Sequence, residues 1–548
     1  MKLFSWFLTI LLVLCGALVI PDRASGKTIE VPRDHNTIQA AVNAASPGDT
    51  ILVDDGTYKE SVKIDKTRLT IKAKNRRRAV IDGEGKRNAG FYAQEGANLA
   101  SIVIQGFEVR HFRSRGIQAF HKNNKYSSWI VEDNFIHHIV QDGILLGGPK
   151  QVIQNNEIAF IGNNGEAIGI LLKSSNDSTI NNNVIYMIRK NGIRVSNHSY
   201  NNKVTNNLIA YIGPGIALNL DNGGNVIMNN YIFMASKGII PKHSKCTKGF
   251  NRIIHNTVVE TTDANIVLGE NTPSGDCIEV LNNVFARAHQ SLIKDTINRG
   301  KQFKVDYNFY DNSFAYILPN GSKARHEDFK TYQQKTGFDK HSMAGEPLFV
   351  NLFMGPQLRN NSPVLNFQTA AVKAGLDRQV GALLQQNLPF MLKQLSMQPV
   401  AASANLSQAK NTTDGKLGSI WKANGKGPHS ITYKLDGPSE YNILWVAPAR
   451  HKQPYNIKKF AVDISTDGKS SSFKTIYTTT VDNLGSPHFH EIGSHKEPFI
   501  RIRFLSNFGD SEMRVDNIWV VHGLPTGATK QPDQLLLPPT KLQVESIQ

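Results

Sequence analysis

Two basic residues, Lys173 and Arg194, stand 21 positions apart in a stretch rich in asparagine and isoleucine. Such a pair could act on a uronic acid, which carries an acidic C5 proton next to its carboxylate. Breaking a 4-linked chain by β-elimination needs a cation on the carboxylate, a base for that proton and an acid for the leaving oxygen. A lysine among other cations can supply the base, because neighbouring positive charge disfavours its ammonium form. Whether the two side chains converge depends on the elements that carry them.

Those elements recur about every two dozen residues. A glycine-isoleucine motif is spaced by 27, 26, 23, 23 and 23 residues, and its glycines are Gly116, Gly143, Gly169, Gly192, Gly215 and Gly238. A second motif alternates with it, and its aligned positions are Asn134, Asn156, Asn183, Asn207, Asn230, Thr257, Asn283 and Asn308. Short strands at a fixed period, with one polar residue at one turn, predict a right-handed parallel β-helix. We expect the asparagines to be structural and to hydrogen-bond their counterparts one coil along.

Alternation along each strand predicts which side chains face outward. The outward pairs are Gln118 and Phe120, Leu145 and Gly147, Leu171 and Lys173, Arg194 and Ser196, Ala217 and Asn219, Ile240 and Lys242, and Val267 and Gly269. These positions hold three cations and no acid. With strands about 4.8 Å apart and a rise of about 3.3 Å per residue, the Cα atoms of Lys173 and Arg194 should lie roughly 8 Å apart. Further candidate substrate contacts on this face are His198, Asn219, Lys242 and His243.

The ends of the repeat carry different patterns. Ile38, Ala41, Val42 and Ala45 share one helical face before Pro47 and Gly48, which predicts a short helix that caps the open end of the β-helix. This start resembles that of pectate-lyase-like β-helix proteins. We expect the β-helix over residues 27–345 and its closing segment and linker over residues 346–400.

A second domain is expected from residue 401 to 523, because the repeat stops and strands of period-two alternation with regular turns begin. The fold class is therefore all-β, a β-helix followed by a β-sandwich. The order of motifs resembles discoidin or F5/8-type-C domains, which share a galactose-binding jelly roll with many carbohydrate-binding modules. The motifs are Asp414-Gly415, Trp421, Leu435 to Gly437, Ser465 to Gly468, Ile500 to Arg503 and Ile518 to Val520. The resemblance implies sugar-binding loops, in which the candidates are Arg450, His451, Asn507 and Phe508.

The chain opens with Lys2, an apolar run from Leu3 to Ile20, and Ala24-Ser25-Gly26, which predicts a secretory signal over residues 1–26. No later apolar stretch is long enough to span a bilayer, so we expect a secreted or periplasmic protein with a poorly ordered tail at 524–548. The formal charge of +17 includes Lys2, Asp22 and Arg23, so cleavage leaves +16. That charge suits an anionic partner.

Two cysteines, Cys246 and Cys277, follow the signal segment and fall in loops of successive coils. In an oxidising compartment we expect them to form one disulfide. The sequence has neither CxxC pairs nor HExxH, so a zinc site is not expected.

The segments GEAIGILLKSSN and GIRVSN resemble polysaccharide lyase family six, the group of chondroitinase B and alginate lyases. The resemblance implies that Lys173, in its Lys-Ser motif, is the base and that Arg194, on the next coil, is the acid. It also implies two glutamates that hold a calcium ion on the substrate carboxylate. Glu166 matches the first, but Ile168 stands at the second, and Val195-Ser196 replaces the usual His-Gly after the arginine. These departures leave calcium dependence open.

The leading expectation is a monomeric secreted lyase of an anionic polysaccharide, not a nucleic-acid-binding protein. A polygalacturonase-type hydrolase ranks low, because it needs paired carboxylates that the outward positions lack. A C5-epimerase shares the proton abstraction without chain cleavage. A non-catalytic surface protein that binds glycans is a further alternative, which the missing second glutamate favours and the spacing of Lys173 and Arg194 opposes.

Overall fold

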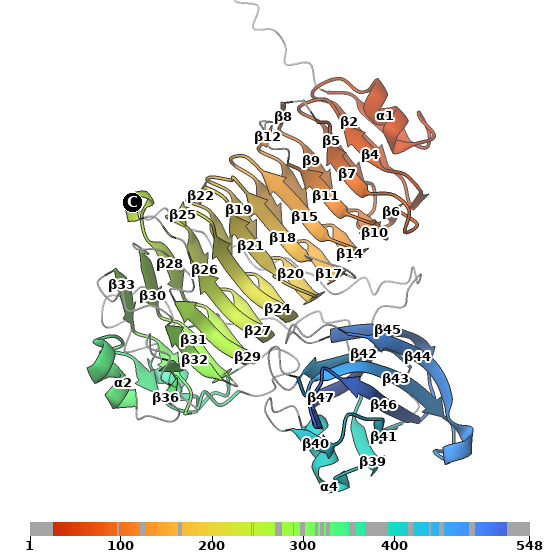
Figure 1. Cartoon of the computed structure of the whole chain (residues 1–548). Helices are drawn as coiled ribbons and strands as arrows, with labels where there is room; N and C mark the ends of the chain where they lie inside the picture. Colours follow the sequence, from red (N-terminus) through yellow and green to blue (C-terminus); the bar gives the residue numbers. More distant parts are fainter. Residues whose placement is uncertain are drawn as a thin grey trace, which may run out of the picture.

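The structure is a computed structural model, and it describes residues 26–522 with internal gaps. The gaps are 96–97, 121–125, 163–166, 243, 245, 269–276, 289, 296–301, 313–315, 318–322, 325–328, 350–357, 368–380, 382–392, 415–419, 438–439, 449–453 and 482–487. Within the described residues a long right-handed parallel β-helix precedes a separate β-sandwich (Figure 1). No helix in the described part of the chain combines the length and the apolar character that a membrane span requires.

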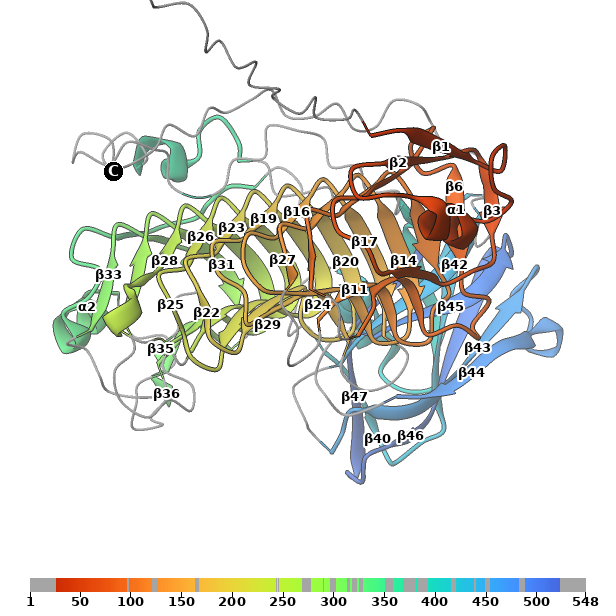
Figure 2. The same ribbon diagram turned by 90° about the horizontal axis from the view of Figure 1, so that it is seen from above.

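Each coil of the β-helix passes through three strand positions. One coil consists of β16 (Val152–Gln154), β17 (Glu157–Ile161) and β18 (Ile168–Lys173), and the next of β19 (Thr179–Asn181), β20 (Val184–Ile188) and β21 (Ile193–Ser196). Strands at the first position join a described 12-stranded sheet, and the coils stack as rungs along one axis (Figure 2). The second and third positions merge further along, where three strands turn the corner unbroken: β24 (Leu208–Asn219), β27 (Tyr231–Pro241) and β29 (Thr257–Leu268).

An asparagine ladder runs through the turn before the second strand position. From Asn156 onward, each amide oxygen accepts the backbone N–H and the side-chain N–H of the asparagine one coil earlier, while the Asn134 oxygen accepts from Phe107 N. The ladder consists of Asn134, Asn156, Asn183, Asn207, Asn230, Asn256, Asn283 and Asn308. The sequence alignment was wrong at one coil, because Asn256 and not Thr257 occupies the ladder. Thr257 instead begins β29, opposite Tyr231, and a threonine lacks the amide that both donates and accepts here.

A second polar ladder follows the third strand position and was not predicted. Its hydrogen bonds run from coil to coil through Gln151, Ser178, Asn202, Asn225 and Asn251. Because its members are of three residue types, a search for one recurring letter does not find it. Together the two ladders satisfy buried backbone N–H groups at two corners of each coil.

The expected capping helix is confirmed as α1 (Ile38–Ala44), which covers the first coils at the N-terminal end (Figure 1). Ile38, Ala41 and Val42 are buried beneath it. The hydroxyl of Thr37 accepts from Ala40 N, and the Glu60 carboxylate accepts from the first two helical N–H groups. These contacts satisfy the donors that every helix start leaves open.

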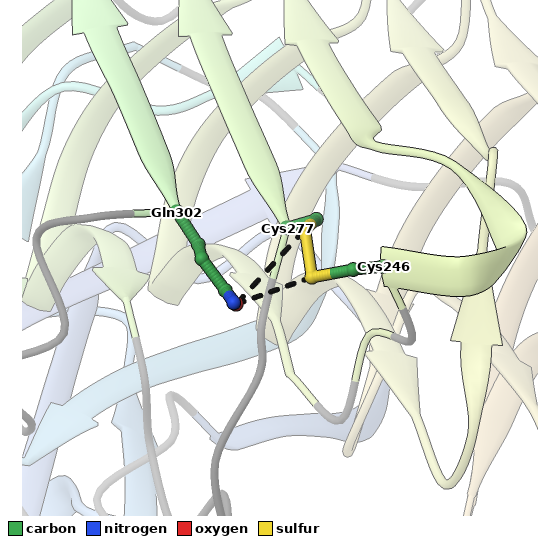
Figure 3. The surroundings of a disulfide bond; sticks show 3 residues. All are labelled: Cys246, Cys277 and Gln302. Carbon is green, nitrogen blue, oxygen red and sulfur yellow. Dashed lines mark hydrogen bonds between the residues drawn. A yellow bond between two sulfur atoms is a disulfide. The ribbon is translucent and has the colours of Figure 1, made fainter.

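Cys246 and Cys277 form a disulfide with a Cα–Cα distance of 5.1 Å across 31 residues (Figure 3). Cys246 begins a short 3-10 turn (Cys246–Lys248), and Cys277 directly precedes the strand β30 (Ile278–Leu281). The side-chain oxygen of Gln302 lies 3.1 Å from the Cys246 sulfur. The bond therefore ties a loop of one coil to the start of the next.

The sandwich has two described five-stranded antiparallel sheets. One contains β38 (Lys393–Gln394), β40 (Trp421–Asn424), β42 (Tyr441–Pro448), β45 (His488–His495) and β47 (Glu512–His522). The other contains β39 (Met397–Ala402), β41 (His429–Leu435), β43 (Ile457–Ser465), β44 (Lys474–Thr480) and β46 (Phe499–Asn507). Because β38 and β39 pair with β47 and β41, the sandwich begins before the boundary expected at residue 401.

The sandwich packs on one side of the β-helix, which we call the flank: the outward side of β17, β20 and the first halves of β24 and β27. Trp445 and Trp519 stack with ring centroids 3.9 Å apart and contact Tyr211 of β24 edge-on, at 6.1 and 6.5 Å. Phe160, Tyr186 and Phe233 of the flank belong to the same buried apolar cluster. The flank is thus a domain interface, which the sequence did not predict.

Candidate functional site

Lys173 and Arg194 lie on neighbouring parallel strands with the offset that the repeat predicts. In the register of β18 and β21, Lys173 is opposite Ser196 and Leu171 is opposite Arg194. Leu172 and Val195, which alternate with them, are fully buried in the β-helix core. Lys173 and Arg194 therefore point outward from the third strand position, on a side that we call the site face: the outward side of β15 (Asp142–Gly147), β18, β21 and the second halves of β24 and β27.

An aromatic ring two coils earlier holds the Lys173 side chain. Its Nζ lies 4.8 Å from the centre of the Phe120 ring. Gly147 sits between them, opposite Lys173 in the register of β15 and β18. A Cβ at Gly147 would lie 2.4 Å from the Phe120 ring and 2.8 Å from the Lys173 carbonyl oxygen, so only glycine leaves room for this contact.

The other outward positions divide the site face into an apolar part and a polar part. Ala217 and Ile240 are outward as expected, but they are buried in a small apolar cluster with Ala264 and Val267. On the coils nearer the C-terminus, an outward-facing residue is therefore not necessarily exposed to solvent. Arg194 is half-buried and pairs with Ala217 in the register of β21 and β24, at the border of this cluster.

His198 forms an ion pair that adds an acid to the site. Its Nδ1 lies 2.5 Å from Oδ2 of Asp221, one coil further on. The side chain of His198 is 70% exposed and that of Asp221 is 17% exposed. Both residues adopt left-handed backbone conformations, with φ of 54° and 61°, in the turns that follow β21 and β24. The sequence signal for Asp221 is its position one repeat after His198.

Asn219 and Lys242 extend the same polar edge. Asn219 pairs with Ser196 and is half-buried at the end of β24. Lys242 follows β27 directly, and its backbone N–H donates to the Leu218 carbonyl. The site face therefore presents Lys173, Arg194, His198, Asn219 and Lys242 on successive coils.

Four expected site residues, Glu166, His243, Arg450 and His451, lie outside the described residues. Ile168, where the family resemblance expects a second glutamate, is buried and pairs with Asp142. Among the described residues, no group of three or more histidine, cysteine or acidic side chains is arranged to hold a metal ion.

The candidate residues of the sandwich have local contacts of their own. The Asn507 amide donates to the carbonyl oxygens of Asp510 and Glu512, and its oxygen accepts from Gly509 N. Asn507 therefore stabilises the turn in which it lies by hydrogen bonds to that turn's backbone. The Phe508 ring lies 6.0 Å from Lys458 Nζ.

Three histidines, His111, His137 and His138, gather at the end of the flank near the sandwich. Nδ1 of His137 lies 2.5 Å from Nδ1 of His138, whose Nε2 lies 2.5 Å from Oε1 of Glu491 in the sandwich. His137 is buried, and its ring stacks on that of Phe135. Burial lowers the pKa of His137 to about 4. Burial alone would raise the pKa of Glu491, but the hydrogen bond with His138 leaves it lowered.

A buried carboxyl group lies further along the same corner. Burial raises the pKa of Glu260 to about 7, although Arg287, 3.3 Å away, opposes the shift. Neither Glu260 nor the histidine cluster was predicted as a special site. Both lie where the second and third strand positions meet, and alternation along a strand says nothing about such corners.

The fold and the site face define a parallel β-helix protein with a β-sandwich docked on its flank. Residues 42–238, less than half of the chain, match a family model described as periplasmic copper-binding protein (NosD). The chain is also similar to the pectate lyase Pel9A, at 14% identity over 63% of this chain and 92% of that chain, with a TM-score of 0.41.

Two similar structures are carbohydrate-binding modules. One is the CBM32 of AlyQ in complex with 4,5-unsaturated mannuronic acid, at 22% identity, covering 24% of this chain and 99% of that chain, with a TM-score of 0.22. The other is CpGH89CBM32-5 from Clostridium perfringens in complex with GalNAc-β-1,3-galactose, at 24% identity, 24% and 95% coverage and a TM-score of 0.21. At these identities the likenesses concern the fold alone.

Proposed function

We propose that this protein is an exported polysaccharide lyase that cleaves a uronic-acid-containing anionic polysaccharide by β-elimination. Lys173 takes the C5 proton, and Arg194 serves the leaving oxygen, the roles that the sequence resemblance gives them. The periplasmic description of the matched family model and the predicted signal segment support export. The net charge of the chain supports an anionic substrate.

The observation that carries the proposal is the register of β18 and β21. It places Lys173 and Arg194 on adjacent strands with an offset of two residues, the offset from which the repeat predicts that both side chains meet one sugar ring. The outward positions of these two strands hold no acid, so a carboxylate substrate meets no repulsion there. A hydrolase that uses paired carboxylates has no support on this face.

A second candidate is a glycan-binding protein without turnover. Its support is the apolar, buried Ile168, which stands where the resemblance expects a calcium ligand. A C5-epimerase would use the same base and leave the chain length unchanged. Product analysis separates the epimerase from the lyase.

The test is the ultraviolet absorbance of the mature protein with a panel of uronic-acid polymers, with and without a calcium chelator. A lyase produces a growing conjugated-alkene signal, which Lys173→Ala should abolish. Lys203→Ala is the matched control, because Lys203 is an exposed lysine on β23 (Lys203–Thr205), at the first strand position. If the wild-type protein binds polymers of the panel measurably but produces no alkene signal, the result would instead favour the glycan-binding protein.

A further inference from the structure

The imidazole of His198 contacts Asp221 through one ring nitrogen, Nδ1, and among the described residues has no hydrogen-bond partner at the other, Nε2. The distance from Nδ1 to Oδ2 of Asp221 is 2.5 Å. A carboxylate at Nδ1 fixes the ring orientation and stabilises the protonated ring. With 70% of the side chain exposed, Nε2–H is free to meet a substrate.

His198 also lies on the coil that carries Arg194, next to the coil that carries Lys173. Ser196, two positions before His198, pairs directly with Lys173. The backbone N–H of Ser174 also donates to the Ser196 carbonyl, so the turn that carries His198 begins directly beside Lys173. A substrate that presents its C5 proton to Lys173 thus has its glycosidic bond near this turn.

The chemistry of the last proton transfer favours an imidazole over a guanidinium. An arginine side chain stays protonated in proteins, so it gives up its proton poorly near neutral pH. An unperturbed imidazole titrates at about 6.5, which suits a general acid. Arg194 is better matched to a role in which it stays charged.

We infer that His198, oriented by Asp221, and not Arg194, protonates the leaving oxygen in the elimination proposed above, which reassigns Arg194 from the leaving oxygen to the uronate carboxylate. The inference rests on the proposed function. Lys173 Nζ takes the proton from C5, the C5–H electrons form the C4–C5 double bond, and the C4–O4 bond breaks. O4 takes the proton from Nε2 of His198, which leaves neutral imidazole and an ammonium on Lys173. Proton exchange with solvent restores both groups, and no oxidant or reductant is needed.

The charged groups around His198 set the expected pH dependence. They are Asp221 on the following coil, Lys173 and Asp177 on the preceding coil, Arg194 on its own strand and Lys242 two coils on. A His198 acid gives the profile of kcat/KM against pH a limb that His198→Gln should remove. Asp221→Asn should move that limb, because the neighbouring charge is lost.

His341 offers a matched control. It too is an exposed histidine whose Nδ1 contacts a carboxylate, Oδ2 of Asp306 at 2.7 Å, and it follows α2 (Phe329–Thr336) near the C-terminal end of the β-helix. His341→Gln should leave the rate and its pH profile unchanged. The unfolding of both variants, followed by circular dichroism, checks that each is folded.

The decisive experiment compares two substrates. On the natural polymer, His198→Gln should lower kcat by about 100-fold or more with little change in KM. On a synthetic uronate with a 4-nitrophenolate leaving group at C4, which departs without a proton, the variant should approach the wild-type rate. Lys173→Ala should stay impaired on both.

An equal loss on both substrates, or a rate on the polymer like that of His341→Gln, would overturn the role of His198 while leaving the lyase intact. Absence of unsaturated product from every polymer with the wild-type protein would overturn the proposed function and this role together.

Discussion

The ammonium of Lys173 rests on the ring of Phe120, two coils earlier, with Nζ 4.8 Å from the ring centre. The contact crosses Gly147, where any Cβ would strike the ring. The side chain expected to act as the base is therefore held in one place, and three successive coils cooperate to hold it. Such positioning is what a proton transfer with fixed geometry requires.

Phe120→Leu should release Lys173 from this position. A cation–π contact is worth about 0.5–2 kcal/mol, so we expect kcat on the polymer to fall by about twofold to thirtyfold with little loss of stability. Phe250→Leu is the control, because Lys304 Nζ lies 4.6 Å from that ring away from the site face. Wild-type turnover in Phe120→Leu would show that the ring does not position the base.

Asn183→Ala should break the asparagine ladder at its centre. The amide is fully buried, donates to the carbonyls of Ile153 and Asn181, and accepts from Asn156. Because each buried group left without a partner costs about 1–3 kcal/mol, urea unfolding should show a loss of about 3 kcal/mol or more.

The control for the ladder is Asn182→Gly. Asn182 is the neighbouring residue with φ of 54°, a conformation that glycine adopts without strain. Its loss of stability should stay below about 1 kcal/mol. Equal losses in the two variants would mean that the ladder contributes no more than any turn asparagine.

Stability should fall in acid partly through His137. Burial lowers its pKa from 6.5 to about 4, so the folded state binds this proton less readily than the unfolded state. This contribution is fully present above pH 6.5 and is lost as pH falls towards 4, and it amounts to about 3 kcal/mol. The groups facing His137 are Glu108, His138 and His111.

Urea unfolding at pH 7.5 and pH 4.5 measures this effect. His137→Gln should lose less stability between the two pH values than the wild-type protein does, because glutamine does not titrate. An identical loss in both would show that His137 is protonated in the folded protein.

Trp445→Ala should loosen the sandwich from the flank. The indole is 1% exposed, stacks on Trp519 and contacts Tyr211, and removal of a buried aromatic ring costs about 3–5 kcal/mol. Small-angle scattering should show a larger radius of gyration. Tyr211→Ala tests the same contact from the β-helix side without changing the sandwich core, and an unchanged radius in both would exclude a docking role for these rings.

The repeat spacing and the alternation of residues along each strand predicted the features that neighbouring segments of the chain determine. The offset of Lys173 and Arg194 followed from the 23-residue step and from alternation along each strand, and the register of β18 and β21 bears it out. The capping helix followed from the shared face of Ile38, Ala41 and Val42. The one ladder error, at Asn256, came from aligning a coil in which His255 replaces the usual asparagine before the ladder position.

What the sequence did not predict lies between segments far apart in the chain. Tyr211 and Phe233 lie on the outward side of the β-helix. Trp445 and Trp519, more than two hundred positions later, belong to the cluster that leaves Phe233 buried and Tyr211 partly buried. His137 is buried for the same kind of reason. The pairing of His198 with Asp221 depends on the shape of two turns, and strand periodicity does not describe turns.

The packing of Trp445 and Trp519 on the flank limits how the sandwich can move relative to the β-helix. A module on a free linker can sweep through solution and raise the local concentration of a polymer. The sandwich of this protein instead packs along the side of the β-helix, so its orientation relative to the coils is fixed. It also covers an apolar strip of the β-helix that would otherwise draw two copies together, so removing the sandwich would leave a surface prone to self-association.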